Sequence, residues 1–243
     1  MDVSIVGGIG EPRVTVVGCG GAGNNVVESL YWNHPGVETV ALSDSEERLS
    51  SVGCSSALFV RPEEMAEVEE LYYDCIASKL ADTDIAFVVV GLGGTFGARV
   101  APLVARVAHE MGITAISIGI QPFDAEQRSG MDETVQQLRS LSDATIVIDN
   151  NRILEIEQDI SIEDGFGIIN RSVSKIISTV TSRISDQIMS LMRGDIADEI
   201  RFDIMSLSDD VHQMTPGEAF SMPEHGVAQA ALFSVEGPAF TFQ

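Results

Sequence analysis

The sequence predicts an α/β fold in which a doubly wound, mainly parallel sheet is covered by helices on both faces. Two observations support this class. Short β-branched runs alternate with helical patterns over the first 150 residues, and two glycine-rich loops each lead from a strand into a helix. Uniformly apolar strands separated by helices are typical of parallel sheets that are buried on both sides. With 243 residues and 44% apolar side chains, the chain is long enough for one large domain.

The expected elements follow from the apolar pattern and from the residues that typically begin and end helices. We expect six strands, at residues 14–17, 37–42, 57–60, 85–90, 114–120 and 144–148. Capping residues, acidic first turns and terminal glycines place helices at about residues 21–31, 62–80, 97–111 and 131–141. Ligands of such sheets bind at the carboxyl ends of the strands, so the loops that follow the strands are the candidate sites.

Beyond residue 160 the pattern changes. From Ile162 to Leu191 the apolar residues step by three or four, which predicts one amphipathic helix of about thirty residues that ends at Gly194. We therefore expect a nucleotide-binding α/β domain at 1–160, a long central-type helix at 161–193 and a truncated C-terminal extension at 194–243. Within the extension, residues 227–235 could form a strand.

The charge is strongly one-sided, with 37 acidic and 14 basic residues and a net charge of −23. This balance disfavours nucleic acid as a partner, because binding to phosphate backbones relies on lysine and arginine. Only two of the basic residues are lysines, which favours a halophilic, salt-rich cytoplasm over an ordinary acidic protein. The chain shows neither a membrane-spanning run nor a secretory signal, so we expect a cytoplasmic location. The three cysteines have no metal-ligand spacing, and no metal site of cysteine and histidine is expected.

The first glycine-rich loop, residues 17–25, reads V-G-C-G-G-A-G-N-N. It follows a strand and opens a helix, so its backbone N–H groups and the helix dipole can face a phosphate group. Gly18, Gly20 and Gly23 also satisfy the G-x-G-x-x-G pattern, and Asp44 follows 26 residues after Gly18. An NAD(P)-dependent oxidoreductase with a Rossmann-type site is therefore an alternative. The four histidines form no recognisable catalytic constellation for it.

The second glycine-rich loop, residues 91–102, reads G-L-G-G-T-F-G-A-R-V-A-P and again opens a helix after a strand. A dinucleotide fold has no need of two such helix openings, whereas a nucleoside di- or triphosphate held from both sides does. At this point the chain resembles the FtsZ/tubulin superfamily, whose two loops G-G-x-G-N-N and G-G-G-T-G-[ST]-G cradle GTP. Residues 121–126, 148–154 and 161–170 resemble further segments of that family, and the resemblance covers about residues 13–193.

The resemblance implies that GTP or GDP is the ligand, with Mg²⁺ as a candidate companion ion. It assigns nucleotide contacts to the first loop, the second loop and the segments that reach ribose and base, where Phe166 packs on guanine and Asn170 reads its edge. The assigned residues are Gly20, Gly21, Ala22, Gly23, Asn24, Asn25, Gly93, Gly94, Thr95, Phe96, Gly97, Arg99, Glu126, Arg128, Asn150, Phe166 and Asn170.

Several positions depart from the family pattern. Phe96, Ala98 and Arg99 replace a threonine, a hydroxyl residue and a glycine, so two hydroxyl donors to phosphate are lost. The loop after the third strand, residues 60–64, carries two carboxylates, which would repel a γ-phosphate unless a cation intervenes. The family's N-x-D-x-x-D catalytic segment is reduced to Asp203.

The function expected is that of a guanine-nucleotide-binding cytoskeletal or scaffold protein with weak or absent GTPase activity. We expect longitudinal self-association into oligomers or filaments, in membrane remodelling or division-related assembly with a membrane-associated protein partner. Whether the chain is an enzyme stays open. A nucleotide-free structural module with a degenerate pocket is a third reading, because a fold does not guarantee its function.

Overall fold

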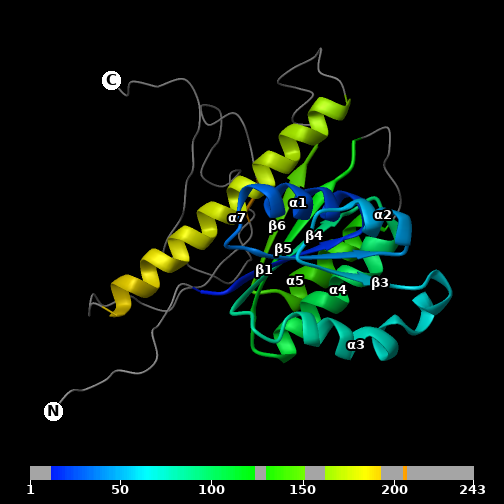
Figure 1. The fold of residues 1–243 in the computed structure, drawn as a ribbon, viewed down its shortest axis with the longest axis horizontal. Coiled ribbons are helices and arrows are strands. Elements are labelled where there is room, and N and C mark those ends of the chain that lie inside the picture. Colours follow the sequence, from blue (N-terminus) through cyan, green and yellow to red (C-terminus); the bar gives the residue numbers. More distant parts are fainter. Residues whose placement is uncertain (1–11, 124–129, 151–161, 193–204, 207–243) are drawn as a thin grey trace.

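A computed structural model describes residues 12–123, 130–150, 162–192 and 205–206. They form one sheet between two layers of helices (Figure 1). The strands are β1 (Val14–Cys19), β2 (Glu38–Ser43), β3 (Ser56–Phe59), β4 (Ile85–Gly91), β5 (Thr114–Gln121), β6 (Ala144–Asp149) and β7 (Met205–Ser206). The helices are α1 (Gly20–Asn33), α2 (Glu46–Ser51), η1 (Pro62–Glu67), α3 (Val68–Lys79), α4 (Thr95–Glu110), α5 (Met131–Leu141) and α7 (Ile162–Met192).

The sheet has the order β3-β2-β1-β4-β5-β6-β7, and every strand pair in it is parallel. All six residues of β1 are buried, as are the first six of β4. The doubly wound, mainly parallel sheet expected from the sequence is confirmed. Uniformly apolar central strands made it predictable, because only helices on both faces can bury such strands.

The chain reverses its direction of travel across the sheet between β1 and β4. From β1 it moves outward to β2 and β3, and from β4 it moves the other way to β5 and β6. In the register, Cys19 at the end of β1 is level with Leu42 of β2 and Val90 of β4. The segments that follow these strands therefore meet at one edge, at the topological switch point where open α/β sheets bind ligands.

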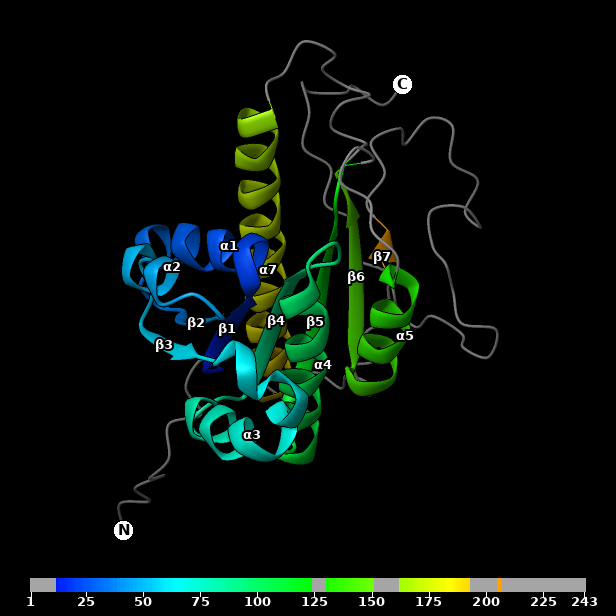
Figure 2. The same ribbon diagram turned by 90° about the vertical axis from the view of Figure 1, so that its right-hand side faces the viewer.

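The helices form two layers (Figure 2). Helices α1 and α7 pack on one face of the sheet, over a core that includes Val16, Phe87 and Ile118. Helices α3, α4 and α5 pack on the other face, over a core that includes Val17, Val88 and Ala115. Because side chains of a strand alternate between faces, the two cores draw on alternate residues of the same strands.

Three elements differ from the sequence-based expectation. Helix α2 was not predicted, because its six residues are too few to show an apolar period, although Ser45 accepts a hydrogen bond from the Arg48 N–H as its N-cap. The helix expected at 62–80 is a 3₁₀ segment, η1, followed by α3. Helix α4 begins at Thr95, two residues before the expected start.

The end of α1 remote from the switch point carries an aromatic pair. Tyr31 and Trp32 meet edge to face, with ring centroids 5.0 Å apart. The Trp32 side chain lies over Gly53, where an added Cβ would come within 2.8 Å of the indole Nε1. Trp32 is nevertheless 70% exposed.

The segment 194–243 is described only at residues 205–206, so the expected strand at 227–235 lies outside the described residues. Within the part of the chain that the structure describes, no helix is both long enough and apolar enough to cross a membrane.

Candidate functional site

Helices α1 and α4 both begin at the switch point, and their N-termini share an unusual composition. Neither N-cap, Cys19 or Gly94, provides a side-chain hydrogen bond, and neither first turn contains an acidic residue. By contrast, α2, α3 and α5 each carry two acidic residues in the first turn. The first N–H groups of a helix have no partner within it, and they carry the positive end of the dipole. The two glycine loops thus present N–H groups and positive potential where an anion could bind.

The two loops are in direct contact with each other. Gly20 has φ = +78°, and a Cβ atom there would lie 3.5 Å from the Phe96 ring and 3.7 Å from the Gly97 nitrogen. A Cβ atom on Gly97 would come within 2.9 Å of the Cys19 carbonyl oxygen and 2.7 Å of a Val90 methyl group. Glycine at these positions is therefore required for the two backbones to approach, and the approach brings both helix N-termini to one place.

Two residues of the first loop are buried and act through packing. A Cβ atom on Gly23 would overlap the Val89 carbonyl oxygen, so this glycine lets α1 lie against β4. The Asn24 side chain is 2% exposed and donates through Nδ2 to the Leu42 carbonyl oxygen at 3.0 Å, while its Oδ1 has no partner in the described structure. Gly21 and Asn25 are exposed, and Ala22 is half-buried. Gly20 is also half-buried, so Gly20, Gly21, Ala22 and Asn25 all keep some exposed surface.

Phe96 fills the core and leaves the site open. Its side chain is 7% exposed and belongs to the apolar cluster beneath α4. The group of Phe96 that could contact a ligand is therefore its backbone N–H at the start of α4. Thr95, the first residue of α4, is exposed and keeps one hydroxyl in this turn. Gly93 is half-buried and Gly94 exposed.

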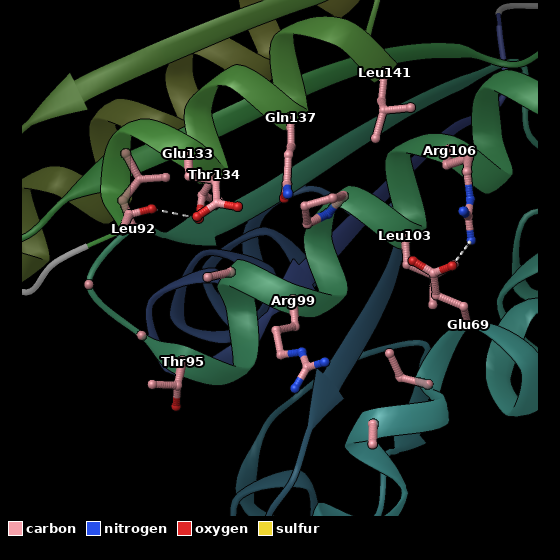
Figure 3. A pocket seen from close by; sticks show the side chains of 17 residues that line it. Glu69, Leu92, Thr95, Arg99, Leu103, Arg106, Glu133, Thr134, Gln137 and Leu141 are labelled. Carbon is pink, nitrogen blue, oxygen red and sulfur yellow. Dashed lines mark hydrogen bonds and ion pairs between the residues drawn. The ribbon is translucent and has the colours of Figure 1, made fainter.

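A pocket of about 690 Å³ adjoins the second loop, between α3, α4 and α5 (Figure 3). Gly93, Gly94 and Thr95 form part of its wall. Arg106 lies in an ion pair with Glu69 at 3.0 Å. Arg99 is exposed, extends from α4 away from the α5 side chains, and has no hydrogen bond or ion pair within the described part of the chain. Its guanidinium is free to meet an anion.

Three other assigned residues, Phe166, Asn170 and Asn150, lie near the ends of β5 and β6 or on the first turns of α7. Phe166 on α7 packs edge to face against Phe123, which follows β5, with centroids 5.3 Å apart. Asn170 lies one turn later on α7 and is half-buried. Asn150 follows β6; its side chain is 1% exposed, and its Oδ1 has no partner among the described residues.

The loop after β3 is arranged differently from the expectation of two carboxylates near a phosphate. The Tyr72 hydroxyl donates to Glu64 and accepts from the Arg61 N–H at 3.0 Å. Arg61 also pairs with Glu64 at 2.9 Å. The hydrogen bonds from Tyr72 and Arg61 lower the pKa of Glu64, and burial raises the pKa of Tyr72. The negative charge of Glu64 is therefore compensated by Arg61. In residues 60–64, Glu63 alone keeps an exposed carboxylate.

Electrostatics at the start of α1 are favourable to an anion. Burial raises the pKa of the Cys19 thiol, so this N-cap stays uncharged. Arg48 of α2 lies against Gly21, where its Nη1 is 3.3 Å from the position of an added Cβ. Arg48 belongs to none of the sequence motifs, since no motif predicts that α2 lies beside the start of α1.

Other assigned residues lie outside the described residues: Glu126, Arg128 and the candidate catalytic Asp203. In the described ranges, no group of three or more His, Cys, Asp and Glu side chains gathers as metal ligands do.

Comparison with known proteins decides between the readings that this geometry allows. Residues 13–158, which include both glycine loops, match the protein family described as "Tubulin/FtsZ family, GTPase domain". The chain belongs to the Tubulin/FtsZ family. The strand order alone would also suit a dinucleotide-binding protein. The match across both loops does not favour the oxidoreductase alternative, which rests on the pattern of the first loop and on Asp44, an exposed residue after β2.

Relatives and solved structures agree with this membership. The chain is 30% identical to the cell division protein FtsZ 2 of Halobacterium salinarum over 204 residues, which cover 78% of this chain and 51% of that protein. It is 32% identical to FtsZ of Aquifex aeolicus over 189 residues, covering 70% and 51%. An FtsZ dimer structure from M. jannaschii matches with a TM-score of 0.65 and 24% identity, over 72% of this chain and 56% of that one. The chain thus spans about half the length of these relatives, and halophilic archaea are among their sources.

Proposed function

We propose that this Tubulin/FtsZ-type domain binds GTP or GDP and associates with further copies of itself as a cytoskeletal or scaffold protein. The observation that carries the proposal is the pair of helix N-termini at the switch point. Both lack capping side chains and acidic residues, while α2, α3 and α5 begin with carboxylates. In a chain with a net charge of −23, the absence of acidic residues from both of these first turns supports a bound phosphate chain.

Helix α7 carries the residues that support guanine as the base of the ligand. Phe166 and Asn170 are four positions apart on this helix, so they lie on one face. An asparagine amide can donate to a ring carbonyl and accept from a ring N–H, which suits guanine. The buried amide of Asn150, with an unsatisfied Oδ1, is a further polar group at this edge of the sheet. Glu126 and Arg128 complete the proposed ribose and phosphate contacts.

We further propose that GTP turnover is weak or absent. Ala98 provides no hydroxyl in the second loop, and the Phe96 side chain is buried in the core. Asp203 is the single acidic residue proposed to act on water, in a neighbouring copy of the chain. The proposed partners are other copies of the chain and a membrane-associated protein that recruits the assembly from the cytoplasm.

The binding proposal is tested by calorimetry with GDP, GTP, ATP and NADH in concentrated KCl. We expect guanine nucleotides to bind in preference to NADH. GDP and GTP should bind within about tenfold of each other, which is roughly 1.4 kcal/mol, because the second loop has lost hydroxyl donors that would reach additional phosphate oxygens.

NADH binding without guanine binding would overturn the proposal in favour of the oxidoreductase. Absence of binding by all four compounds would instead support a nucleotide-free structural module. A hundredfold preference for GTP would show that a group in this site senses the γ-phosphate, and Arg99→Ala would then identify whether it is the unpaired Arg99.

A further inference from the structure

Arg48 covers the first turn of α1 from the side of α2. Its Nη1 lies 3.3 Å from the place that a Cβ atom on Gly21 would take, and Gly21 is the second residue of α1. The residue before it, Gly20, faces the start of α4. The N-terminus of α1 therefore has two neighbours: the N-terminus of α4 against Gly20, and a guanidinium against Gly21.

The charge of Arg48 is not neutralised by the described protein. Its guanidinium forms no hydrogen bond or ion pair with any described residue, although Glu46 and Glu47 precede it directly on α2. Three other described arginines pair with carboxylates, whereas Arg48, like Arg99, does not: Arg13 pairs with Asp82 and Asp84, Arg61 with Glu64, and Arg106 with Glu69. In an acidic chain, an unpaired guanidinium beside the positive end of a helix places two like charges together. An anion between them would relieve this repulsion.

The backbone of Arg48 is held in position. Its N–H donates to Ser45 Oγ at 3.3 Å, and its carbonyl oxygen accepts from the Val52 N–H at 3.2 Å and from Ser51 Oγ at 2.9 Å. Leu49 and Val52 pack against the core on the α1 face of the sheet. Only the flexible side chain of Arg48 has to adjust when a ligand arrives.

We infer that Arg48 is a phosphate-binding residue, which contacts the phosphate groups of a nucleotide at the N-terminus of α1. A guanidinium can form two parallel hydrogen bonds to phosphate oxygens, which a lysine cannot reproduce. This contact compensates for the hydroxyl donors that the second loop lacks. The inference rests on the proposed function, because it takes the ligand to be a guanine nucleotide.

The test compares Arg48→Ala and Arg48→Lys with the wild type by calorimetry with GDP and with GTP. Arg139→Ala is the matched control, since Arg139 is an exposed arginine on α5 and its loss changes the net charge equally. We expect Arg48→Ala to weaken both nucleotides by about tenfold or more, as loss of a charge-assisted bidentate contact should. Arg48→Lys should fall between Arg48→Ala and the wild type, and Arg139→Ala should bind as the wild type does.

Unchanged affinity of Arg48→Ala, or an equal loss in Arg139→Ala, would overturn the inference while leaving nucleotide binding intact. A wild type that binds neither nucleotide would instead overturn the proposed function. Thermal unfolding of each variant shows whether a loss of nucleotide affinity comes from a folding defect. Should Arg48→Ala unfold, Arg48→Lys decides, because it keeps the charge and the aliphatic stem, and affinity equal to that of the wild type would contradict bidentate binding.

Discussion

The glycines of the first loop serve two different purposes. Gly20 adopts a positive φ of +78°, a conformation that side chains disfavour, and it faces the second loop. Gly23 has an ordinary conformation, but it is buried where α1 crosses β4. In one motif, Gly20 is therefore required for the backbone conformation at the switch point, and Gly23 is required for the packing of α1 on β4.

We predict that Gly23→Ala destabilises the fold. The added methyl group would overlap the Val89 carbonyl oxygen and would force α1 away from β4. Overpacking of this kind costs about 2 kcal/mol or more, because neither neighbour is a flexible side chain. Urea unfolding measures the change. Gly36→Ala is the control, since nothing lies within 4 Å of a Cβ atom there, and an equal loss in both variants would contradict the packing argument.

At this scale the sequence predicts the site only in part. The motif treats Asn24 and Asn25 alike, whereas Asn24 is buried and bonded to β2 and Asn25 is exposed. Successive residues of a helix point in different directions, and the direction depends on which face packs against the sheet. Phe96 likewise stands in the motif among residues assigned to the ligand, but its side chain belongs to the core. The role of Arg48 depends on a contact between α1 and α2 that no local pattern encodes.

At the scale of elements, the segment from β3 to α3 is held by a small polar network. Tyr72 of α3 reaches back to Glu64 in η1 and to the Arg61 backbone. Hydrogen bonds from Tyr72 and then Arg61 lower the pKa of Glu64, so its contribution to stability is present above the ordinary carboxyl pKa and is lost as the pH falls through the lowered value.

We predict that Tyr72→Phe reduces the unfolding free energy at pH 7 by about 1 kcal/mol, the net value of one hydrogen bond, because the Arg61 N–H loses its acceptor. Glu64 loses at the same time the hydrogen bond that lowers its pKa most, so this pKa returns toward the ordinary range. The difference between wild type and variant should therefore shrink as the pH is lowered below about 4.5. Urea titrations at several pH values measure it, and a difference that is constant with pH would contradict the linkage to Glu64.

The sequence predicts long, apolar elements well and short ones poorly. Each of the six expected strands has a counterpart, and the clearest are central strands such as β4, where burial on both faces leaves a continuous apolar run. α2 and the two-residue β7 carry too little pattern to be recognised. The boundary between η1 and α3 is also invisible in the sequence, because Pro62 and the acidic residues that follow suit the first turn of either helix type.

At the scale of the molecule, the parallel sheet brings both glycine-rich loops to one edge, while the net charge of −23 acts over the whole surface. Such a charge opposes both compactness and association at low ionic strength. Salt shortens the range of the repulsion, with a Debye length of about 3 Å at 1 M.

We predict that self-association increases with protein concentration and with KCl in the presence of GDP or GTP. Light scattering and sedimentation measure it. Phosphate release should be slow or undetectable; if it occurs, it should rise more than linearly with protein concentration, and Asp203→Ala should abolish it while leaving affinity nearly unchanged. A strict monomer in concentrated salt with either nucleotide would contradict the scaffold proposal, and rapid turnover would contradict weak GTPase activity.

α1 also connects two distant parts of the molecule. Its first turn lies at the switch point, and its last turn, which leads to the start of β2, carries Trp32. A helix of this length extends for about 21 Å. Trp32 is the single tryptophan of the chain and is 70% exposed. The protein thus has a built-in fluorophore at the end of α1 remote from the first glycine loop, where its emission would respond to a surface that covered this end of the helix.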